Sequence, residues 1–217
     1  VCPTAAVSIP GYDMADVEPS APAGETIDAA DLLRAIKSRR SVRSFKPEPV
    51  GRQELEFVLQ AGRYTATAKN AQGCRFIVVQ DGLAELKRLV WDGIDGLLAL
   101  PADEKPRWVK LYKPFLRDAC AGRQDFLFRD APAVAYVAAE RADDAGLAAQ
   151  NMELMAAAQG LGVLFNGYLC RASEELPAVR AFLESDERPL QMCLLLGRPV
   201  VSYPRTAPRM PGDFIVK

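Results

Sequence analysis

The sequence predicts an α+β protein, in which helices and strands are mixed without strict alternation. Short apolar runs with β-branched residues, of which Phe76-Ile77-Val78-Val79 is typical, indicate strands. Longer segments carry apolar residues on one helical face, as at Leu32, Leu33 and Ile36. At 217 residues the chain is long enough for one substantial core, and it contains no internal repeat.

The first half of the chain is expected to hold three helices and one strand. Asp28 is a suitable N-cap for a helix over 29–40, whose last turns carry the basic residues Lys37, Arg39 and Arg40. An extended Lys46-Pro47-Glu48-Pro49 segment follows. Beyond it we expect a helix over 52–64, a strand over 74–80 and a helix over 83–100.

The second half begins with residues 101–129, where aromatic and charged residues alternate irregularly, and we expect a helical excursion that covers a pocket. The remaining elements are expected to be a strand over 133–139, a long helix capped by Asp143 or Asp144 and ending at Gly160, a strand over 163–165, a helix over 174–183 and a strand over 190–196. The long helix is small or apolar on most faces, which favours a core or a subunit interface. Four prolines after Gly197 predict an extended arm.

Composition excludes several functions. The chain has no histidine, which rules out a Ser-His-Asp triad, Cys-His catalysis and imidazole metal ligands. Its five cysteines form no Cys-x-x-Cys, so we expect no metal site and read them as reduced thiols of a cytoplasmic protein. A net charge of -1 gives no general attraction to nucleic acid or to anionic membranes. No apolar run reaches membrane-spanning length, and we expect no signal peptide.

One folded domain preceded by a tail is predicted. Residues 1–24 are expected to be a tail and linker, and residues 25–217 the folded domain with its arm. Cys2-Pro3-Thr4-Ala5-Ala6-Val7 is similar to the closing Cys-Pro of a bacterial ferredoxin cluster run. The tail is therefore either a processed or cloned end, or the remnant of a ferredoxin-like domain.

Two polar motifs suggest one ligand. Arg39, Arg40, Ser41 and Arg43 gather guanidinium and hydroxyl donors that suit a phosphate, although such a cluster is also common as a solvated helix end. Thr67, Lys69, Asn70 and Gln72 present amide edges that suit a pyrimidine-like ring, with Lys69 able to stabilise charge on it; a capped loop is the simpler alternative. Flavin mononucleotide (FMN) has both parts.

Two further segments are candidates for the same ligand. Asn166-Gly167 follows the apolar Val163-Leu164-Phe165 and is either a turn or a point where the backbone approaches a flat ring. Arg205 and Arg209 lie in the proline-rich arm and gain a role only if the arm returns to the phosphate.

In their order along the chain, these motifs resemble the FMN-dependent nitroreductase family. The resemblance runs from about residue 28 to 211 and rests mainly on Ser-Arg-Arg-Ser-Val-Arg-Ser-Phe (38–45) and Ala-Gln-Asn-Met-Glu-Leu-Met-Ala-Ala-Ala-Gln-Gly-Leu-Gly (149–162). The chain departs from the family at Ala66-Thr67, where Pro-Ser is frequent, and at Gly73-Cys74, where Pro-Trp is frequent. These departures concern the flavin edge and the substrate shape.

The resemblance implies an α-β-α sandwich with a mainly antiparallel sheet that forms an intertwined homodimer, with FMN at the subunit interface. It implies that Arg39, Ser41 and Arg209 bind the phosphate, with added contacts from Arg40. Arg43 would lie near the ribityl chain and pyrimidine end, and Thr67, Asn70 and Gln72 would come from the partner subunit. Asn166 and Gly167 would approach the flavin N5, and Phe165 would belong to the same cofactor-binding set. The flavin would carry the chemistry, tuned by Arg43 and Lys69, with no catalytic side chain.

The leading functional prediction is an oxidoreductase that passes electrons from NAD(P)H through FMN to a nitro, quinone or enone acceptor. Alternatives are a related flavoenzyme that dehalogenates or fragments a flavin, and a ferredoxin-linked reductase. A non-enzymatic alternative is a module that binds anions or nucleic acid through Arg39, Arg40 and Arg43, which the near-neutral net charge disfavours.

Overall fold

A four-stranded antiparallel sheet forms the centre of the computed structural model, which describes residues 16–18, 22 and 25–216. Its strand order is β1-β2-β4-β3. The strands are β1 (Arg75–Val79), β2 (Ala133–Ala138), β3 (Gly162–Phe165) and β4 (Leu190–Gly197). The predicted tail falls mostly outside the described residues, and so does Cys2.

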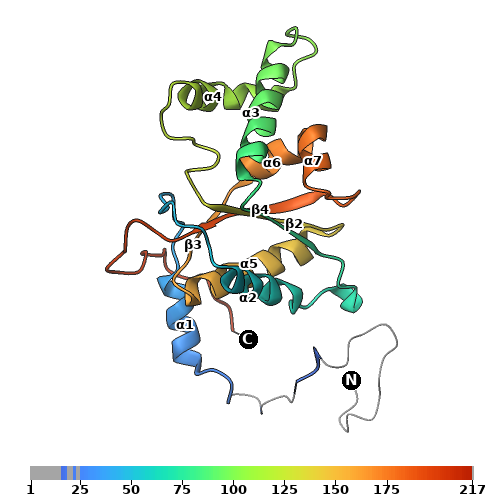
Figure 1. The fold of residues 1–217 in the computed structure, drawn as a ribbon. Helices are drawn as coiled ribbons and strands as arrows, with labels where there is room; N and C mark the ends of the chain where they lie inside the picture. The colour runs from blue at the N-terminus through green and yellow to red at the C-terminus, as the bar shows by residue number, and fades with distance from the viewer. Residues whose placement is uncertain (1–15, 19–21, 23–24, 217) are drawn as a thin grey trace.

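Helices cover both faces of this sheet (Figure 1). On one side lie α2 (Arg52–Arg63) and α5 (Ala142–Ala158), which pack on each other, with α1 (Ala29–Ser38) beyond them. On the other lie α3 (Leu83–Ala99), η3 (Arg107–Tyr112), α4 (Lys113–Cys120), α6 (Gly167–Glu175) and α7 (Pro177–Phe182). The predicted α+β sandwich with an antiparallel sheet is confirmed.

The middle strands β2 and β4 are apolar apart from Gln191, because both of their faces are covered. Every residue of β2 is buried. Val134 and Tyr136 belong to the core on the α3 and α6 side, whereas Ala133, Ala135 and Val137 belong to the core on the α2 and α5 side. Small side chains on the second face let the two helices approach the sheet closely. Gly62 of α2 shows how close: a Cβ there would lie 2.7 Å from the ring of Phe76.

Most predicted elements agree with the structure to within one residue at each end, and three helices differ more. The first helix ends at Ser38, two residues early, because Arg39 turns to extended backbone and the chain then runs beside β3. Its predicted N-cap is confirmed: the Asp28 carboxylate accepts from the Ala30 N–H at 2.8 Å. In place of the predicted helix over 174–183 there are two helices. The first, α6, already begins at Gly167, which the prediction missed, and the second, α7, is separate because Pro177 cannot continue α6.

The long helix α5 starts at Ala142 with Arg141 as its N-cap, so neither Asp143 nor Asp144 caps it. Both acids instead lie in the first turn, where the positive end of the helix dipole favours them. Asp144 accepts from the Ala68 N–H at 3.3 Å. Gly160 follows the helix in the left-handed conformation, with φ of 74°.

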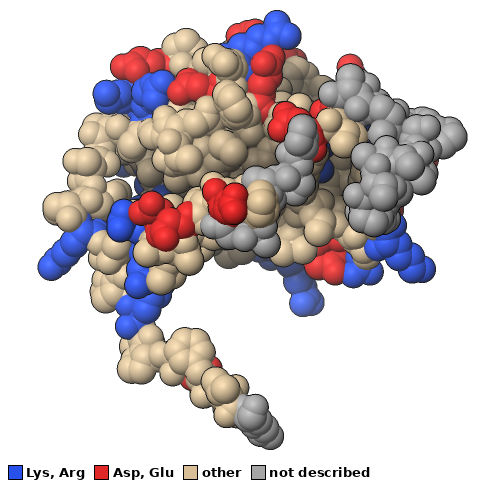
Figure 2. Space-filling view, turned by 90° about the horizontal axis from the view of Figure 1, so that it is seen from below, with Lys and Arg blue, Asp and Glu red and all other residues tan. Residues whose placement is uncertain are grey.

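Large apolar side chains remain exposed at two parts of the surface. Leu32, Leu33 and Ile36 are 39–49% exposed on α1. The arm after β4 projects from the body as a largely uncharged segment (Figure 2), and Phe214 and Val216 near its end are 86% and 96% exposed. No helix in the described part of the chain is long and apolar enough to cross a membrane.

Candidate functional site

The arginine-rich segment after α1 is fixed between β3 and the C-terminal arm. Ser41 forms a parallel bridge with Val163, and the Val42 N–H donates to the Val163 carbonyl at 2.9 Å. Farther along, the Lys46 N–H donates to the Arg198 carbonyl at 2.8 Å. Gly162 permits this approach, since a Cβ there would lie 2.5 Å from the Val42 side chain. Two motifs that are far apart in sequence therefore lie side by side.

Arg39 and Arg40 line a pocket of about 290 Å³ between α1, α5 and the arm. The Arg39 Nη1 lies 3.2 Å from a carboxylate oxygen of Glu153, whose side chain is 3% exposed. The Arg40 guanidinium stacks on the ring of Tyr203, at 4.3 Å from its centre. Both arginines are half-buried, so they are not a solvated helix end. Ser41 is exposed and does not line this pocket.

The arm reaches this pocket through Tyr203, a residue that sequence reasoning missed. Arg205 and Arg209, which the sequence singled out, are exposed farther along the arm. Neither makes an ion pair or a side-chain hydrogen bond with another described residue. Within one chain, then, the arm returns to Arg39 and Arg40 through Tyr203, but Arg205 and Arg209 do not line the pocket.

Asn166 serves as the N-cap of α6. Its side-chain oxygen accepts from the Leu169 N–H at 2.9 Å, and its side-chain nitrogen donates to the Leu127 carbonyl. Its backbone N–H donates to the Cys193 carbonyl at 2.8 Å. Because these groups of Asn166 are already hydrogen-bonded, Gly167 is the residue of this pair whose backbone can approach a flat ring. A Cβ at Gly167 would meet no atom within 4 Å, so the chain leaves this position open.

Beside this junction lies a cavity of about 440 Å³. Four predicted site residues line it: Arg43, Phe165, Asn166 and Gly167. The far wall comes from η3, α6 and the loop after α4, and supplies Leu111, Tyr112, Phe126, Arg129, Tyr168 and Arg171. The predicted pocket cover over 101–129 is thus present. Arg129 and Arg171 were missed because no spacing in the sequence links them to the other motifs.

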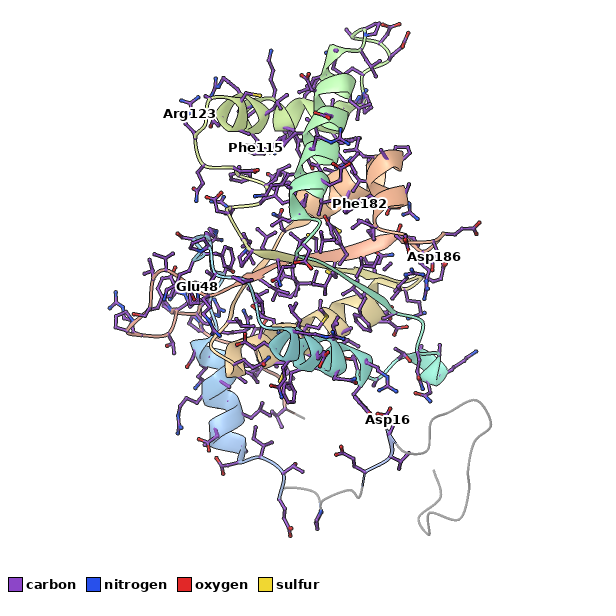
Figure 3. All side chains as sticks on the ribbon, in the orientation of Figure 1. Asp16, Glu48, Phe115, Arg123, Phe182 and Asp186 are labelled. Atoms are coloured by element: carbon purple, nitrogen blue, oxygen red, sulfur yellow. The ribbon has the colours of Figure 1, made fainter. Side chains whose placement is uncertain are left out.

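Aromatic side chains fix the shape of the far wall. Phe115 and Phe126 stack with ring centres 4.0 Å apart, and the Tyr168 ring stands edge-on to both. Phe115, labelled in Figure 3, belongs to α4. The Tyr112 hydroxyl donates to the Tyr168 carbonyl at 2.8 Å, and burial raises the pKa of Tyr112 to about 12. That hydroxyl therefore stays protonated at neutral pH and serves as a structural donor.

The second predicted motif lies elsewhere in the single chain. Thr67 and Gln72 line a separate pocket of about 380 Å³, whereas Lys69 and Asn70 are exposed. Lys69, Asn70 and Gln72 have φ of 57°, 53° and 50°, a left-handed conformation that is uncommon for residues other than glycine and less favourable for lysine and glutamine than for asparagine. The Thr67 hydroxyl accepts from the Gln72 N–H at 2.9 Å and closes this loop. The loop thus holds a strained conformation of the kind found at binding sites.

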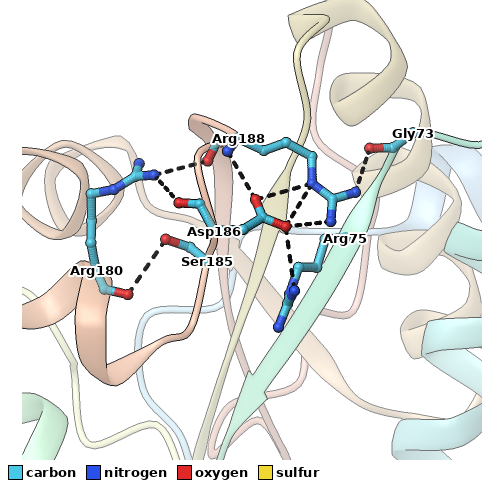
Figure 4. Close-up of polar contacts among 6 residues, drawn as sticks. All are labelled: Gly73, Arg75, Arg180, Ser185, Asp186 and Arg188. Carbon is cyan, nitrogen blue, oxygen red and sulfur yellow. Dashed lines mark hydrogen bonds and ion pairs between the residues drawn. The ribbon is translucent and has the colours of Figure 1, made fainter.

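A polar network ties the end of the same loop to the turn before β4 (Figure 4). The Arg188 guanidinium donates to both carboxylate oxygens of Asp186 and, at 3.1 Å, to the carbonyl of Gly73. Arg75 adds a second ion pair to Asp186 at 3.3 Å. These arginines hold the pKa of Asp186 well below its usual range, so the network remains charged at neutral pH.

Comparison with known proteins agrees with the motifs. A sequence profile of the Nitroreductase family matches residues 36–198. A search of the curated proteins finds no match.

Solved structures share the fold. A nitroreductase with bound FMN from Bacteroides fragilis superposes with a TM-score of 0.68 at 23% identity, covering 86% of this chain and 99% of that one. A nitroreductase with bound FMN from Desulfitobacterium hafniense gives 0.67 at 22% identity, covering 86% and 98%. The FMN-dependent nitroreductase NfnB from Mycobacterium smegmatis, in complex with NADPH, gives 0.61 at 21% identity, covering 80% and 90%.

Proposed function

Because the chain belongs to the Nitroreductase family, we propose that it binds FMN and passes electrons from NAD(P)H to a nitro, quinone or enone acceptor. The FMN present in the Bacteroides fragilis and Desulfitobacterium hafniense structures supports the cofactor. The NADPH in the NfnB complex supports the electron donor.

The observation that carries this proposal is the alignment of the arginine segment with β3. This alignment places Arg39 and Arg40, whose hydrogen-bond donors suit a phosphate, on the same segment as Arg43, which lines a cavity together with Gly167. Arginine side chains donate hydrogen bonds and accept none, so the donor set fits a phosphate. Gly167, open on the side where a Cβ would stand, fits a flat ring. The residues present therefore fit FMN.

FMN, when bound, accepts and donates hydride, which lets a chain without histidine catalyse this reaction. The chain's own residues bind the cofactor and the substrate, orient them and exclude water. Arg39 and Arg40 would hold the phosphate of FMN, and Arg43 would stabilise negative charge on the flavin ring. The aromatic wall would keep water from the cavity. One turnover with a quinone consumes NAD(P)H and a proton and yields NAD(P)⁺ and the hydroquinone. With a nitro group the products are NAD(P)⁺, the nitroso compound and water.

The proposal includes an intertwined homodimer. The exposed apolar face of α1 and the apolar end of the arm each need a surface that the single chain does not supply. The loop with Thr67, Asn70 and Gln72 lines a pocket separate from the cavity, which fits the idea that it completes the site of the other subunit. Ser41 and Arg209 are proposed to join the phosphate site in that assembly.

An absorbance spectrum followed by addition of NADPH tests the proposal. A yellow protein with a flavin band that NADPH bleaches, and that menadione or a nitroarene restores, is expected. A colourless protein that retains no added FMN would overturn the proposal and favour the anion-binding module. A flavin band that NADPH leaves unchanged, but that dithionite and reduced ferredoxin bleach, would replace NAD(P)H by a ferredoxin-type donor. Release of halide, or breakdown of the flavin itself, would identify one of the two related reactions.

A further inference from the structure

Three arginines line the cavity beside the β3–α6 junction. Arg129 lies in the loop between α4 and β2, Arg171 lies one turn into α6, and both line the same cavity as Arg43. The three residues come from three separate parts of the chain. The charge therefore belongs to the cavity itself and is not a basic run in the sequence.

No described carboxylate pairs with these three arginines, although most arginines elsewhere in the described chain have such a partner. Asp125 lies four residues before Arg129, but its carboxylate accepts from the backbone N–H groups of Leu127 and Phe128 and from the Trp91 side chain. Burial and the nearby charge of Arg43 lower the pKa of Arg129. An anion in the cavity would stabilise the charged form of Arg129 against both effects.

Aromatic rings lie against two of these arginines. The Arg129 guanidinium stacks over Phe126 at 4.4 Å from the ring centre, and the Arg171 guanidinium lies 5.8 Å from that of Trp108. The Tyr168 ring is 5.8 Å from Phe126 and edge-on to it. Stacking orients the guanidinium planes and leaves their hydrogen-bonding edges for a ligand. A flat ring with an anionic substituent matches both features.

We infer that Arg129 and Arg171 recognise a carboxylate on the electron acceptor, so that the preferred substrates are nitroarenes or quinones bearing a carboxylate. This rests on the proposed function, in which Arg43 serves the flavin and the other two arginines are left for the substrate. A phosphate of NADPH is another anion that arginines bind, and the experiment separates the two sources.

Calorimetry tests the inference with two probes of similar shape, 4-nitrobenzoate and the neutral 4-nitrobenzamide. Their dissociation constants are measured on the protein as purified, after its FMN content has been read from the absorbance. The variants are the double change Arg129→Gln, Arg171→Gln and, as a control, Arg117→Gln. Arg117 is an exposed arginine of α4 that does not line the cavity.

Wild type and Arg117→Gln should bind the carboxylate at least about 10-fold more tightly than the amide, the usual scale of a charge-assisted hydrogen bond. The double variant should lose most of this preference. If it fails to fold, Arg171→Gln alone, at an exposed position, should still reduce the preference several-fold.

Two results would overturn the inference: no preference in wild type, or a preference that survives the double change. If the preference survives while the double variant loses NADPH affinity, the arginines are assigned to the nucleotide. Absence of FMN from the purified protein would instead count against the proposed function, and the calorimetric preference would still be measured.

Discussion

Arg39 and Glu153 form an ion pair that joins the end of α1 to the middle of α5, with Nη1 3.2 Å from the carboxylate oxygen. Gln150 donates to the second carboxylate oxygen of Glu153 at 2.9 Å. The acid is almost fully buried, whereas the arginine is 28% exposed at the edge of the pocket. Glu153 therefore fixes the position of Arg39 and leaves part of its guanidinium free for a ligand.

Arg39→Ala should weaken two separate properties. Without Arg39 the buried Glu153 charge has no cation partner, and we expect the free energy of unfolding of the apoprotein to fall by about 1–3 kcal/mol. FMN affinity should fall about 10-fold to 100-fold through loss of the phosphate contact. Adding Glu153→Gln to Arg39→Ala should restore stability but not FMN affinity. Urea unfolding and flavin fluorescence titration measure the two effects. Arg52→Ala, at an exposed arginine of α2, is the control.

Arg43→Ala should lower the reduction potential of bound FMN, because the arginine stabilises the negative charge that reduction adds. A loss of about 1.4 kcal/mol corresponds to about 30 mV for a two-electron couple. Dye-equilibrated photoreduction measures the potential. Lys46→Ala, at an exposed residue that does not line the cavity, should leave it unchanged. Equal potentials in wild type and Arg43→Ala would assign the stabilising charge to another residue, with Lys69 the next candidate.

Leu33→Lys should dissociate the proposed homodimer. Leu33 is 49% exposed on the apolar face of α1, and a buried lysine at a subunit contact would be costly. Analytical ultracentrifugation at micromolar concentration should give a dimer for wild type and for Lys37→Gln, a control on the same helix. The Leu33→Lys variant should sediment as a monomer of 23.7 kDa. A wild-type protein that sediments only as the monomer would exclude the homodimer.

Asp186→Ala should loosen the loop that ends at Gly73. Without its carboxylate, Arg188 loses the partner that orients it toward the Gly73 carbonyl. Hydrogen exchange over 67–74 should become faster, with little change over α3, and Asp92→Ala on α3 should leave the loop unaffected. Because the pKa of Asp186 is lowered, its contribution holds at neutral pH and is lost as the pH falls through that low value. Unchanged exchange over 67–74 would show that other contacts hold the loop.

The described cysteines should differ in reactivity. Burial raises the pKa of Cys170 to about 12 and that of Cys193 well above its usual range, whereas Cys120 is exposed. Iodoacetamide at pH 8 should therefore label Cys120 first, and Cys170 and Cys193 only in urea. An unfolded thiol ionises near pH 9, so the stability from keeping Cys170 protonated is present below pH 9 and lost as the pH rises toward 12. Peptide mass spectrometry reads the order, and rapid labelling of folded Cys193 would contradict it.

Local sequence determined the elements and the main motifs of this protein. Apolar runs identified the four strands, most clearly β2 and β4, whose residues are mostly buried between the two helical layers. Asp28 identified the start of α1, since a capping carboxylate acts on the N–H groups next to it. The 38–45 motif identified the arginines and their chemistry, which depends on residue type more than on surroundings.

Only the tertiary structure decided which residues meet. In the folded chain Asn166 caps α6 and Glu153 pairs with Arg39. Arg129 and Arg171 line the same cavity. No periodicity encodes these contacts, because each joins elements whose separation in space is set by how helices pack on the sheet. The single chain keeps Thr67 and Gln72 in a pocket apart from Gly167. A second subunit is the simplest means of joining them, and packing between subunits is a property that one chain's local sequence does not contain.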